Sequence, residues 1–139
     1  MIFGIGTDIV QTSRMHDAIA RHQYRFADKI LGVDEQLVFR MRYDNDPAKG
    51  ERYLATRFAA KEALSKAMRT GFREPMSWHG VQLLNQDTGM PYFLFNETLS
   101  SWFGERGLVA HVSISDEKEY ALAFVILETS AASLAMNEK

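Results

Sequence analysis

The chain has 139 residues, of which 46% are hydrophobic and 24% are charged, and its formal net charge is −2. These values are typical of one folded domain, and a chain so close to neutral is unlike a general nucleic-acid binder. The absence of cysteine excludes disulfides, thiol nucleophiles and thiolate metal sites. The N-terminus is not basic, Asp8 interrupts its apolar run and no stretch is long enough to span a membrane, so we expect a cytoplasmic protein without a membrane partner.

The charge is divided unevenly along the chain. Residues 1–73 carry 13 Lys and Arg against 9 Asp and Glu, whereas residues 74–139 carry 3 against 9. The first half could therefore attract an anionic partner.

Residues Ile2–Val10 read as a β-strand whose side chains alternate between two faces. Gly4, Gly6 and Asp8 share one of these faces. Because glycine within a strand often marks a close backbone approach, we expect this face to receive a closely packed helix. Asp8 would then point toward that helix, although it could also simply end the strand in solvent.

Three short helices are expected next. Thr12 or Ser13 can cap the first, which runs to about His22, and the second covers Tyr24–Leu31. Asp34 can cap the third, with Leu37, Val38 and Met41 on its apolar side. The polar stretch Tyr43–Gly50 has strong turn chemistry and is predicted to be a loop.

The longest predicted helix spans Glu51–Arg69 and contains neither Pro nor Gly. Its apolar residues spread almost all the way round the cylinder, which is typical of a helix buried on more than one side. Two charged pairs, each one turn apart, interrupt this surface: Glu62 with Lys66, and Arg57 with Lys61. Charges in a buried helix need a partner or a metal, because their desolvation is costly.

The second half of the sequence changes to the period of β-strands. Strands are predicted at Val81–Asn85, Met90–Phe95, Leu108–Ser115 and Tyr120–Leu127, with a short helix at Thr98–Phe103. The fold class is therefore α+β, an antiparallel sheet with a long central helix. Residues 1–128 form a single domain, and residues 129–139 read as a polar, Ala- and Ser-rich tail that frays.

Two carboxylates, Asp8 and Glu62, can face each other across the contact between strand and helix. Oxygen ligands of this kind suit Mg²⁺, which typically takes one or two carboxylates together with substrate phosphates and water. Lys66 would reach those phosphates. The simpler alternative is an ion pair between Glu62 and Lys66, worth about 0.2–0.5 kcal/mol.

Other charged side chains also have alternative readings. Arg57 and Lys61 offer further contacts for an anion, and His111, which shares the polar face of its strand with two serines, is a candidate general base. His111 could equally be an ordinary histidine at the edge of a strand. The basic residues Arg14, Arg21 and Arg25 form either a solvated stripe or a docking surface.

At these residues the chain resembles a known family, the holo-[acyl-carrier-protein] synthases, which are the short class of 4′-phosphopantetheinyl transferases. The resemblance covers residues 2–128 and is carried by four ordered motifs. These are Gly4–Val10 with Arg14, Arg57–Lys66 followed by Thr70 and Gly71, Thr88–Pro91, and His111–Ser115 with Glu119 and Tyr120. The long-helix motif is the strongest of the four.

The resemblance implies a fold like that of the 4′-phosphopantetheinyl transferases and a role in fatty acid biosynthesis. The 4′-phosphopantetheine arm of coenzyme A would move to a serine of apo-acyl carrier protein, with release of 3′,5′-ADP. Asp8 and Glu62 would bind Mg²⁺, and Lys66 would contact the pyrophosphate and assist the leaving group. His111 would help to deprotonate the serine, with a metal-bound water held by Glu62 as an equal rival.

The resemblance also implies how coenzyme A and the carrier protein are held. Residues Arg57, Lys61, Lys66, Gly71, Gly89 and Pro91 would contact coenzyme A. Residues Arg14, Arg21 and Arg25 would dock the acidic helix of the carrier protein, and the active chain would be a homotrimer with sites between subunits. Met90 departs from the family, which has Lys or Arg in this turn, and Arg69 or Arg73 could supply the missing charge.

Two further hypotheses stay open at this point. The chain could be a non-catalytic module that binds a carrier protein or a nucleotide through its basic helix. Alternatively, it could be a phosphatase or nucleotide hydrolase that uses the same metal site.

Overall fold

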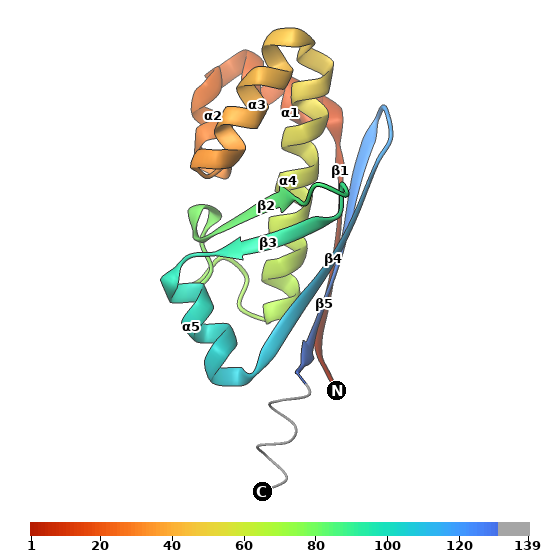
Figure 1. Ribbon diagram of the computed structural model, residues 1–139. Helices are drawn as coiled ribbons and strands as arrows, with labels where there is room; N and C mark the ends of the chain where they lie inside the picture. The colour runs from red at the N-terminus through yellow and green to blue at the C-terminus, as the bar shows by residue number, and fades with distance from the viewer. Residues whose placement is uncertain (131–139) are drawn as a thin grey trace, which may run out of the picture.

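The computed structural model describes residues 1–130 and contains helices and antiparallel strands, which confirms the α+β class (Figure 1). Within the described residues, no helix is both long enough and apolar enough to cross a membrane. In chain order the elements are β1 (Ile2–Gln11), α1 (Thr12–His22), α2 (Tyr24–Ile30), α3 (Val33–Asn45), α4 (Pro47–Met68), the 3₁₀ turn η1 (Trp78–Gly80), β2 (Val81–Asn85), β3 (Pro91–Phe95), α5 (Glu97–Arg106), β4 (Leu108–Asp116) and β5 (Tyr120–Thr129).

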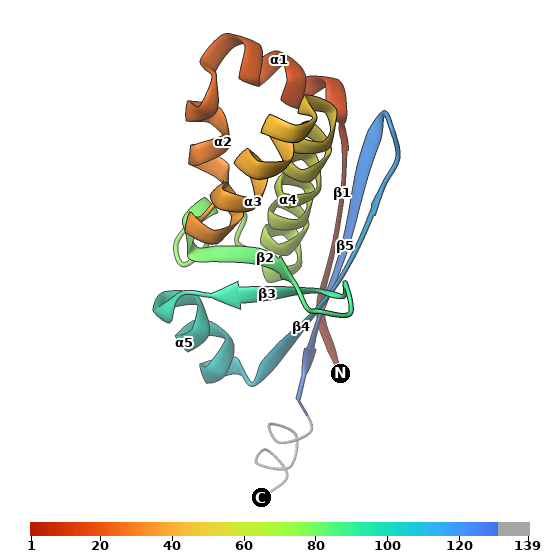
Figure 2. The same cartoon turned by 45° about the horizontal axis from the view of Figure 1, so that its top comes forward.

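The strands form two antiparallel sheets. The first has the order β1-β5-β4, so the N-terminal strand pairs with the last one, and Asp8 lies opposite Ala123. The second is the β2–β3 hairpin. The helices α1, α2 and α3 gather around one end of α4, and α5 lies toward its other end (Figures 1 and 2).

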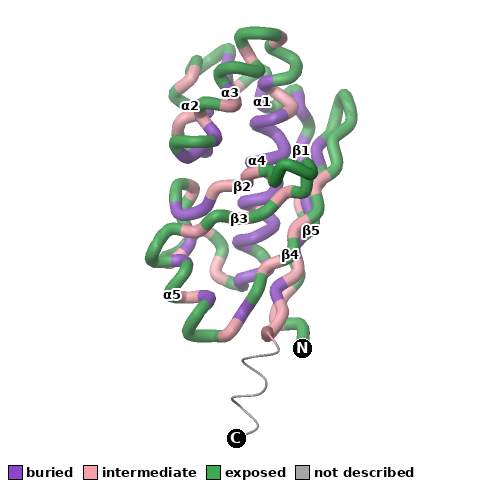
Figure 3. Tube along the Cα trace, in the orientation of Figure 1, coloured by how far each residue is buried: buried purple, intermediate pink, exposed green. Residues whose placement is uncertain are grey.

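Helix α4 is the centre of the molecule and is buried on more than one side, as its apolar surface predicts (Figure 3). The glycine face of β1 packs directly on its backbone. A Cβ atom on Gly4 would come within 1.9 Å of the Ala67 carbonyl oxygen, and one on Gly6 within 1.8 Å of the Ala63 oxygen. The predicted close approach of strand and helix is therefore confirmed, and no larger residue fits at either glycine.

The predicted loop at Tyr43–Gly50 is wrong. Helix α3 continues to Asn45 and α4 begins at Pro47, so Asp46 alone separates them. The Asp46 side chain accepts a hydrogen bond from the Ala48 N–H (3.1 Å), and Pro47 occupies the first helical position. Gly50 lies inside α4 because the two helices approach closely there, and a Cβ on it would come within 2.6 Å of the Tyr43 Cβ.

The predicted apolar side of α3 is also only partly right. Leu37 and Met41 are each 67% exposed, whereas Phe39 and the charged Glu35 are fully buried. Hydrophobic spacing could not predict this arrangement, because Glu35 faces the interior, where it pairs with Lys61. The first residue of α3 is Val33, and Gly32 rather than Asp34 holds the N-cap position.

The domain assignment to residues 1–128 stays a prediction. Strand β5 includes Thr129, the first residue of the predicted tail, whereas residues 131–139 lie outside the described part of the chain. The Thr129 N–H donates to the Met1 carbonyl (2.9 Å), so the first residue and the end of β5 lie together.

Candidate active site

Asp8 lies on the same face of β1 as Gly4 and Gly6, and this face points at α4. Two residues of strand advance about as far as one turn of helix, roughly 6 Å, so the contacts of Gly4 with Ala67 and of Gly6 with Ala63 continue to Asp8 one turn further along. There the Lys66 Nζ donates to the Asp8 Oδ1 (3.1 Å) and to the Thr7 carbonyl (2.9 Å). The ion pair of Lys66 is thus made with Asp8 on the neighbouring strand.

Glu62 shares this setting with Asp8. Partial burial raises the pKa of Glu62, and the negative charge of Asp8 raises it further. The positive charges of Lys66 and Arg14 lower it. Two carboxylates that repel each other electrostatically can be stabilised by a cation between them. Strand β1 and helix α4 therefore bring Asp8, Glu62 and Lys66 together, as the sequence predicts.

The donor set fits Mg²⁺ with an incomplete protein shell. Within residues 1–130, no group of three or more His, Cys, Asp or Glu side chains is placed to hold a metal ion. Asp8 and Glu62 supply carboxylate oxygens only, and Mg²⁺ commonly keeps several waters and completes its shell with substrate phosphates. The two carboxylates could therefore hold Mg²⁺ together with a phosphate-bearing substrate.

Arg57 lies beside a cavity with a volume of about 870 Å³. The wall is strongly basic, because Arg42, Lys49 and Arg52 line it together with Arg57. The remaining lining residues come from α3, α4, β2 and β4: Met41, Asn45, Tyr53, Thr56, Asn85, Ile114 and Asp116. A concave surface with four cations suits a ligand that carries phosphates.

The Arg57 guanidinium is held by three hydrogen bonds. Its Nε donates to the Leu83 carbonyl (3.1 Å), its Nη1 to the Thr56 Oγ1 (3.0 Å) and its Nη2 to the Asn85 Oδ1 (2.5 Å). The guanidinium also stacks 4.0 Å from the centre of the Tyr53 ring, whose burial raises the pKa of that phenol to about 12. Only 4% of Arg57 is exposed, so its position is fixed by its surroundings.

The expectation that Lys61 contacts coenzyme A is wrong, because Lys61 is completely buried. Its Nζ donates to the Glu35 Oε1 (2.7 Å) and to the carbonyl groups of Ile30 (2.7 Å) and Trp78 (2.9 Å). All three ammonium N–H groups are used within the protein. Burial lowers the pKa of Lys61, and the charge of Glu35 opposes that shift.

The predicted glycine and proline contacts fall in two places. Gly89 (φ +90°) and Pro91 belong to the β2–β3 turn, where the Gly89 carbonyl accepts from the side-chain amide of Asn85 (2.9 Å), a residue of the cavity wall. Gly71 (φ +59°) follows the C-terminal end of α4 and does not line this cavity. Met90, the departure from the family, is 62% exposed.

The structure identifies which cations accompany Arg57. The Arg69 side chain donates to the Phe3 carbonyl and lies over the Phe3 ring, so it is held away from the β2–β3 turn. The cavity instead takes its additional charge from Arg42, Lys49 and Arg52, which the sequence reading did not single out; Lys49 lies in the stretch that it predicted to be a loop. The Asp46-Pro47 pair could have indicated that a helix begins here, since an acidic N-cap followed by Pro marks the start of a helix.

His111 is exposed and lies on the face of the sheet that points away from α4. On β4, Val112 and Ile114 face inward opposite Val125 and Ala123 of β5, so His111 between them faces outward. Its Nε2 lies 2.7 Å from the Glu128 Oε1. Within one chain, the sheet therefore separates His111 from Asp8 and Glu62.

The three arginines of the predicted docking surface are all exposed on α1 and at the start of α2. Arg14 lies nearest the carboxylates, because its charge acts on Glu62 and its guanidinium sits 5.6 Å from the Phe58 ring centre. Arg21 and Arg25 both line a shallow depression with His22 and Tyr24. These residues form a basic surface that begins at the candidate site and continues away from it.

Comparisons with known proteins show which family the chain belongs to. A family model described as the 4′-phosphopantetheinyl transferase superfamily matches residues 4–125. The holo-[acyl-carrier-protein] synthase of Methylibium petroleiphilum is 52% identical over 129 residues, which is 93% of this chain and 98% of that protein. The crystal structure of the holo-[acyl-carrier-protein] synthase from Neisseria meningitidis superposes with a TM-score of 0.85 at 39% identity and covers 93% of this chain and 100% of that one.

A holo-(acyl-carrier-protein) synthase from Bacillus anthracis, solved in complex with CoA (3′,5′-ADP), has a TM-score of 0.77 at 33% identity. The similarity covers 94% of this chain and 99% of the Bacillus chain. The present chain thus has the fold and the sequence of a 4′-phosphopantetheinyl transferase. Within that superfamily it belongs to the holo-[acyl-carrier-protein] synthase family, which confirms the resemblance drawn from its four motifs.

Proposed function

We propose that this protein transfers the 4′-phosphopantetheine group of coenzyme A to a serine of apo-acyl carrier protein, releases 3′,5′-ADP and depends on Mg²⁺. The observation that carries the proposal is one continuous arrangement along α4. Arg57 lines a basic cavity, and Glu62 and Lys66 lie further along the same helix beside Asp8. The name of the Methylibium relative and the CoA (3′,5′-ADP) complex of the Bacillus relative support the same assignment.

In the proposed reaction, the serine oxygen forms a bond to the phosphorus that carries the pantetheine arm. The bond from that phosphorus to the bridging oxygen of the pyrophosphate breaks, and 3′,5′-ADP leaves with the electron pair. Asp8 and Glu62 would hold Mg²⁺, which when bound neutralises charge on the pyrophosphate oxygens. Lys66, already directed at Asp8, would contact the pyrophosphate and stabilise the departing oxygen.

The cavity beside Arg57 is suited to the nucleotide part of coenzyme A. Its four basic side chains match the phosphates of 3′,5′-ADP, and the Tyr53 ring and Met41 provide apolar surface. This assignment replaces the contact expected from Lys61. The β2–β3 turn with Gly89 and Pro91 would close one side through Asn85.

The serine proton has two candidate acceptors, His111 and Glu62 acting through a water. Because His111 lies on the outer face of the sheet, it can serve a site only on a second copy of the chain. The outer face also exposes apolar side chains, including Ile5 and Ile9 on β1 and Leu122 and Phe124 on β5. Both observations favour sites formed between copies of the chain, and we propose that the assembly is a homotrimer.

The carrier protein would dock on the exposed residues Arg14, Arg21 and Arg25. An acidic helix placed there would bring its serine toward Glu62, because Arg14 already lies within electrostatic reach of that carboxylate. The proposed reaction needs only soluble substrates, so a cytoplasmic location remains our prediction.

Mass spectrometry of apo-carrier protein incubated with the enzyme, coenzyme A and Mg²⁺ tests the proposal. We expect the carrier to gain the mass of one phosphopantetheine, and Glu62→Gln to abolish the gain. Carrier binding without any mass gain would instead support the non-catalytic module. Release of 3′,5′-ADP without an acceptor would support a hydrolase.

A further inference from the structure

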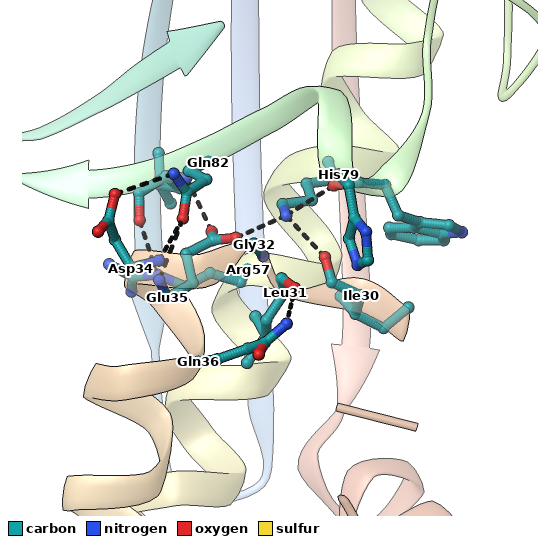
Figure 4. A network of polar contacts seen from close by, with 12 residues as sticks. Ile30, Leu31, Gly32, Asp34, Glu35, Gln36, Arg57, His79 and Gln82 are labelled. Carbon is teal, nitrogen blue, oxygen red and sulfur yellow. Dashed lines mark hydrogen bonds and ion pairs between the residues drawn. The ribbon is translucent and has the colours of Figure 1, made fainter. Parts of the chain in front are cut away.

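A buried ion pair joins Lys61 of α4 to Glu35 of α3, and Figure 4 shows Glu35 within the surrounding network of polar contacts. Both side chains are completely buried. The Glu35 Oε1 accepts from the Lys61 Nζ (2.7 Å) and from the Gly32 N–H (2.9 Å), and its Oε2 accepts from the Leu83 N–H (2.8 Å). The pair therefore connects α4 and the start of α3 to strand β2.

Leu83 connects this network to Arg57 in the wall of the basic cavity. Its N–H is bound by Glu35, and its carbonyl accepts from the Arg57 Nε (3.1 Å). Both groups lie on the edge of β2 that faces away from β3, because Leu83 is opposite Phe93 at a non-hydrogen-bonded position of the antiparallel ladder, where N–H and C=O point outward. Glu35 and Arg57 are thus linked through a single peptide segment.

Strand β2 contributes two of the three hydrogen bonds that hold the guanidinium. Besides Leu83, it provides Asn85, whose side-chain oxygen accepts from Nη2. With Thr56 as the third partner, these bonds use three of the five N–H groups of Arg57, and the side chain of Tyr53 lies against the guanidinium as a further partner. The position of β2 therefore determines where the guanidinium lies in the cavity wall.

A second connection between α3 and β2 lies beside the ion pair. The Gln82 Oε1 accepts from the Asp34 N–H (2.9 Å) and the Glu35 N–H (3.2 Å), and its Nε2 donates to the Asp34 Oδ2 (3.1 Å). Gln82 is only partly buried, so it can be replaced without opening the interior. It offers an independent way to loosen β2.

We propose that Glu35 is a positioning residue for Arg57: through the Leu83 peptide it fixes β2 and so aligns the Arg57 guanidinium for the anionic nucleotide. The inference rests on the proposed function, in which this nucleotide is that of coenzyme A. A charged pair is not needed here for stability alone, since apolar residues of similar volume often replace a buried ion pair without loss. An apolar residue, however, cannot accept the Leu83 N–H.

Two paired replacements separate these roles. Glu35→Leu with Lys61→Met removes both charges and the acceptor for Leu83, while it keeps apolar volume in the interior. Glu35→Gln with Lys61→Met also removes both charges but retains a carbonyl oxygen for the Leu83 N–H. Arg40→Gln is the matched control, because it breaks a half-exposed ion pair between α2 and α3 (Arg40 with Asp28, 3.0 Å) that does not touch β2.

Calorimetric titration with 3′,5′-ADP gives the primary measurement. We expect the Leu/Met pair to weaken binding roughly tenfold, the Gln/Met pair to bind more nearly like the parent, and Arg40→Gln to match the parent. In an Arg57→Ala background, the Leu/Met pair should cause no further loss, because the residue it positions is absent. In turnover, KM for coenzyme A should rise while KM for the carrier protein stays constant.

Parent-like affinity of the Leu/Met pair, or an equal loss in the Arg57→Ala background, would overturn the proposal. If that pair does not fold, Gln82→Met is the deciding variant. A loss of affinity for 3′,5′-ADP that is absent when Arg57 is already replaced by Ala supports the proposal. Unchanged affinity refutes it.

The Arg57 Nε–H signal in NMR hydrogen exchange separates this proposal from the proposed function. Slow exchange in the parent that is lost in the Leu/Met pair, or in Gln82→Met, supports positioning even if the parent fails to bind 3′,5′-ADP. Such a failure to bind would refute the nucleotide assignment alone. Unchanged exchange would refute positioning.

Discussion

Gly6 of β1 lies against the backbone of α4 so closely that its missing side chain is a structural requirement. An added Cβ would approach the Ala63 carbonyl oxygen to 1.8 Å, and this oxygen belongs to the hydrogen-bonded backbone of a helix. The strand would have to move away from the helix. Since Asp8 is on this strand and Glu62 on this helix, the same contact sets the separation of the two carboxylates.

Replacement of this glycine should therefore damage both stability and activity. We expect Gly6→Ala to lower the free energy of unfolding by about 3 kcal/mol or more, because backbone atoms cannot be displaced as easily as a side chain. Urea denaturation followed by circular dichroism measures the change. Gly104→Ala in α5 is the control: nothing lies within 4 Å of its added Cβ, and we expect a gain of about 0.5–1 kcal/mol. A Gly6→Ala variant as stable as the parent would contradict the close packing.

The raised pKa of Glu62 gives a pH-dependent prediction for the metal-free protein. A carboxyl group with a raised folded-state pKa contributes stability below its ordinary value of 4.5, and that contribution is lost as pH rises through the folded-state pKa. Glu62→Gln cannot ionise, so it should equal the parent in stability at pH 4 and exceed it near pH 7. Urea unfolding in EDTA across this range tests the sign. A variant that is less stable than the parent at pH 7 would show that the carboxylate is already stabilised without metal.

The placement of His111 predicts complementation between two inactive variants. If each site combines the carboxylates of one subunit with His111 of another, His111→Ala and Glu62→Gln damage different partners in the same site. Subunits mixed after denaturation at equal amounts should recover about a quarter of the parent activity, because random assembly pairs two intact faces at that frequency. Each variant refolded alone is the control. If His111→Ala alone retains full activity, His111 is not the base, and Glu62 acting through a water takes its place.

The two basic surfaces should be separable by mutation. Arg42→Gln, in the cavity wall, should weaken 3′,5′-ADP binding several-fold and leave carrier-protein affinity unchanged. Arg21→Gln, on the exposed face of α1, should do the reverse and also reduce the salt dependence of carrier binding. Calorimetry with each ligand checks the pair. Loss of both affinities in either variant would mean that the surfaces are not independent.

The sequence was most informative at the contact between β1 and α4, because the same glycines that form a pattern in the strand also allow the helix to approach it. The glycines at positions 4 and 6 predicted the helix contact, and with it the proximity of Asp8 to Glu62. The error over Lys61 has the opposite origin. Its partner Glu35 lies 26 positions away on α3, a helix whose apolar residues Leu37 and Met41 are exposed. No rule of sequence spacing relates Lys61 to Glu35.

The basic cavity also escaped the sequence reading for a physical reason. Its basic residues come from α3 and α4, and the junction of these two helices consists of polar residues that are equally common in loops. The Asp46 cap starts α4, and the tertiary contact between Gly50 and Tyr43 packs the two helices together on either side of it. Likewise, the alternation along β4 predicted that His111 lies on a polar face. It did not predict whether that face points toward α4 or away from it.

The single-residue junction at Asp46 has a consequence for ligand binding. Met41, Arg42 and Asn45 precede it and Lys49 and Arg52 follow it, so most of the cationic wall is one short stretch of backbone that is rigid on both sides of a sharp bend. A wall built in this way exists before the ligand arrives. Binding then avoids the entropic cost of ordering a loop, and the affinity for a nucleotide should depend on which side chains the bend carries rather than on a closing motion.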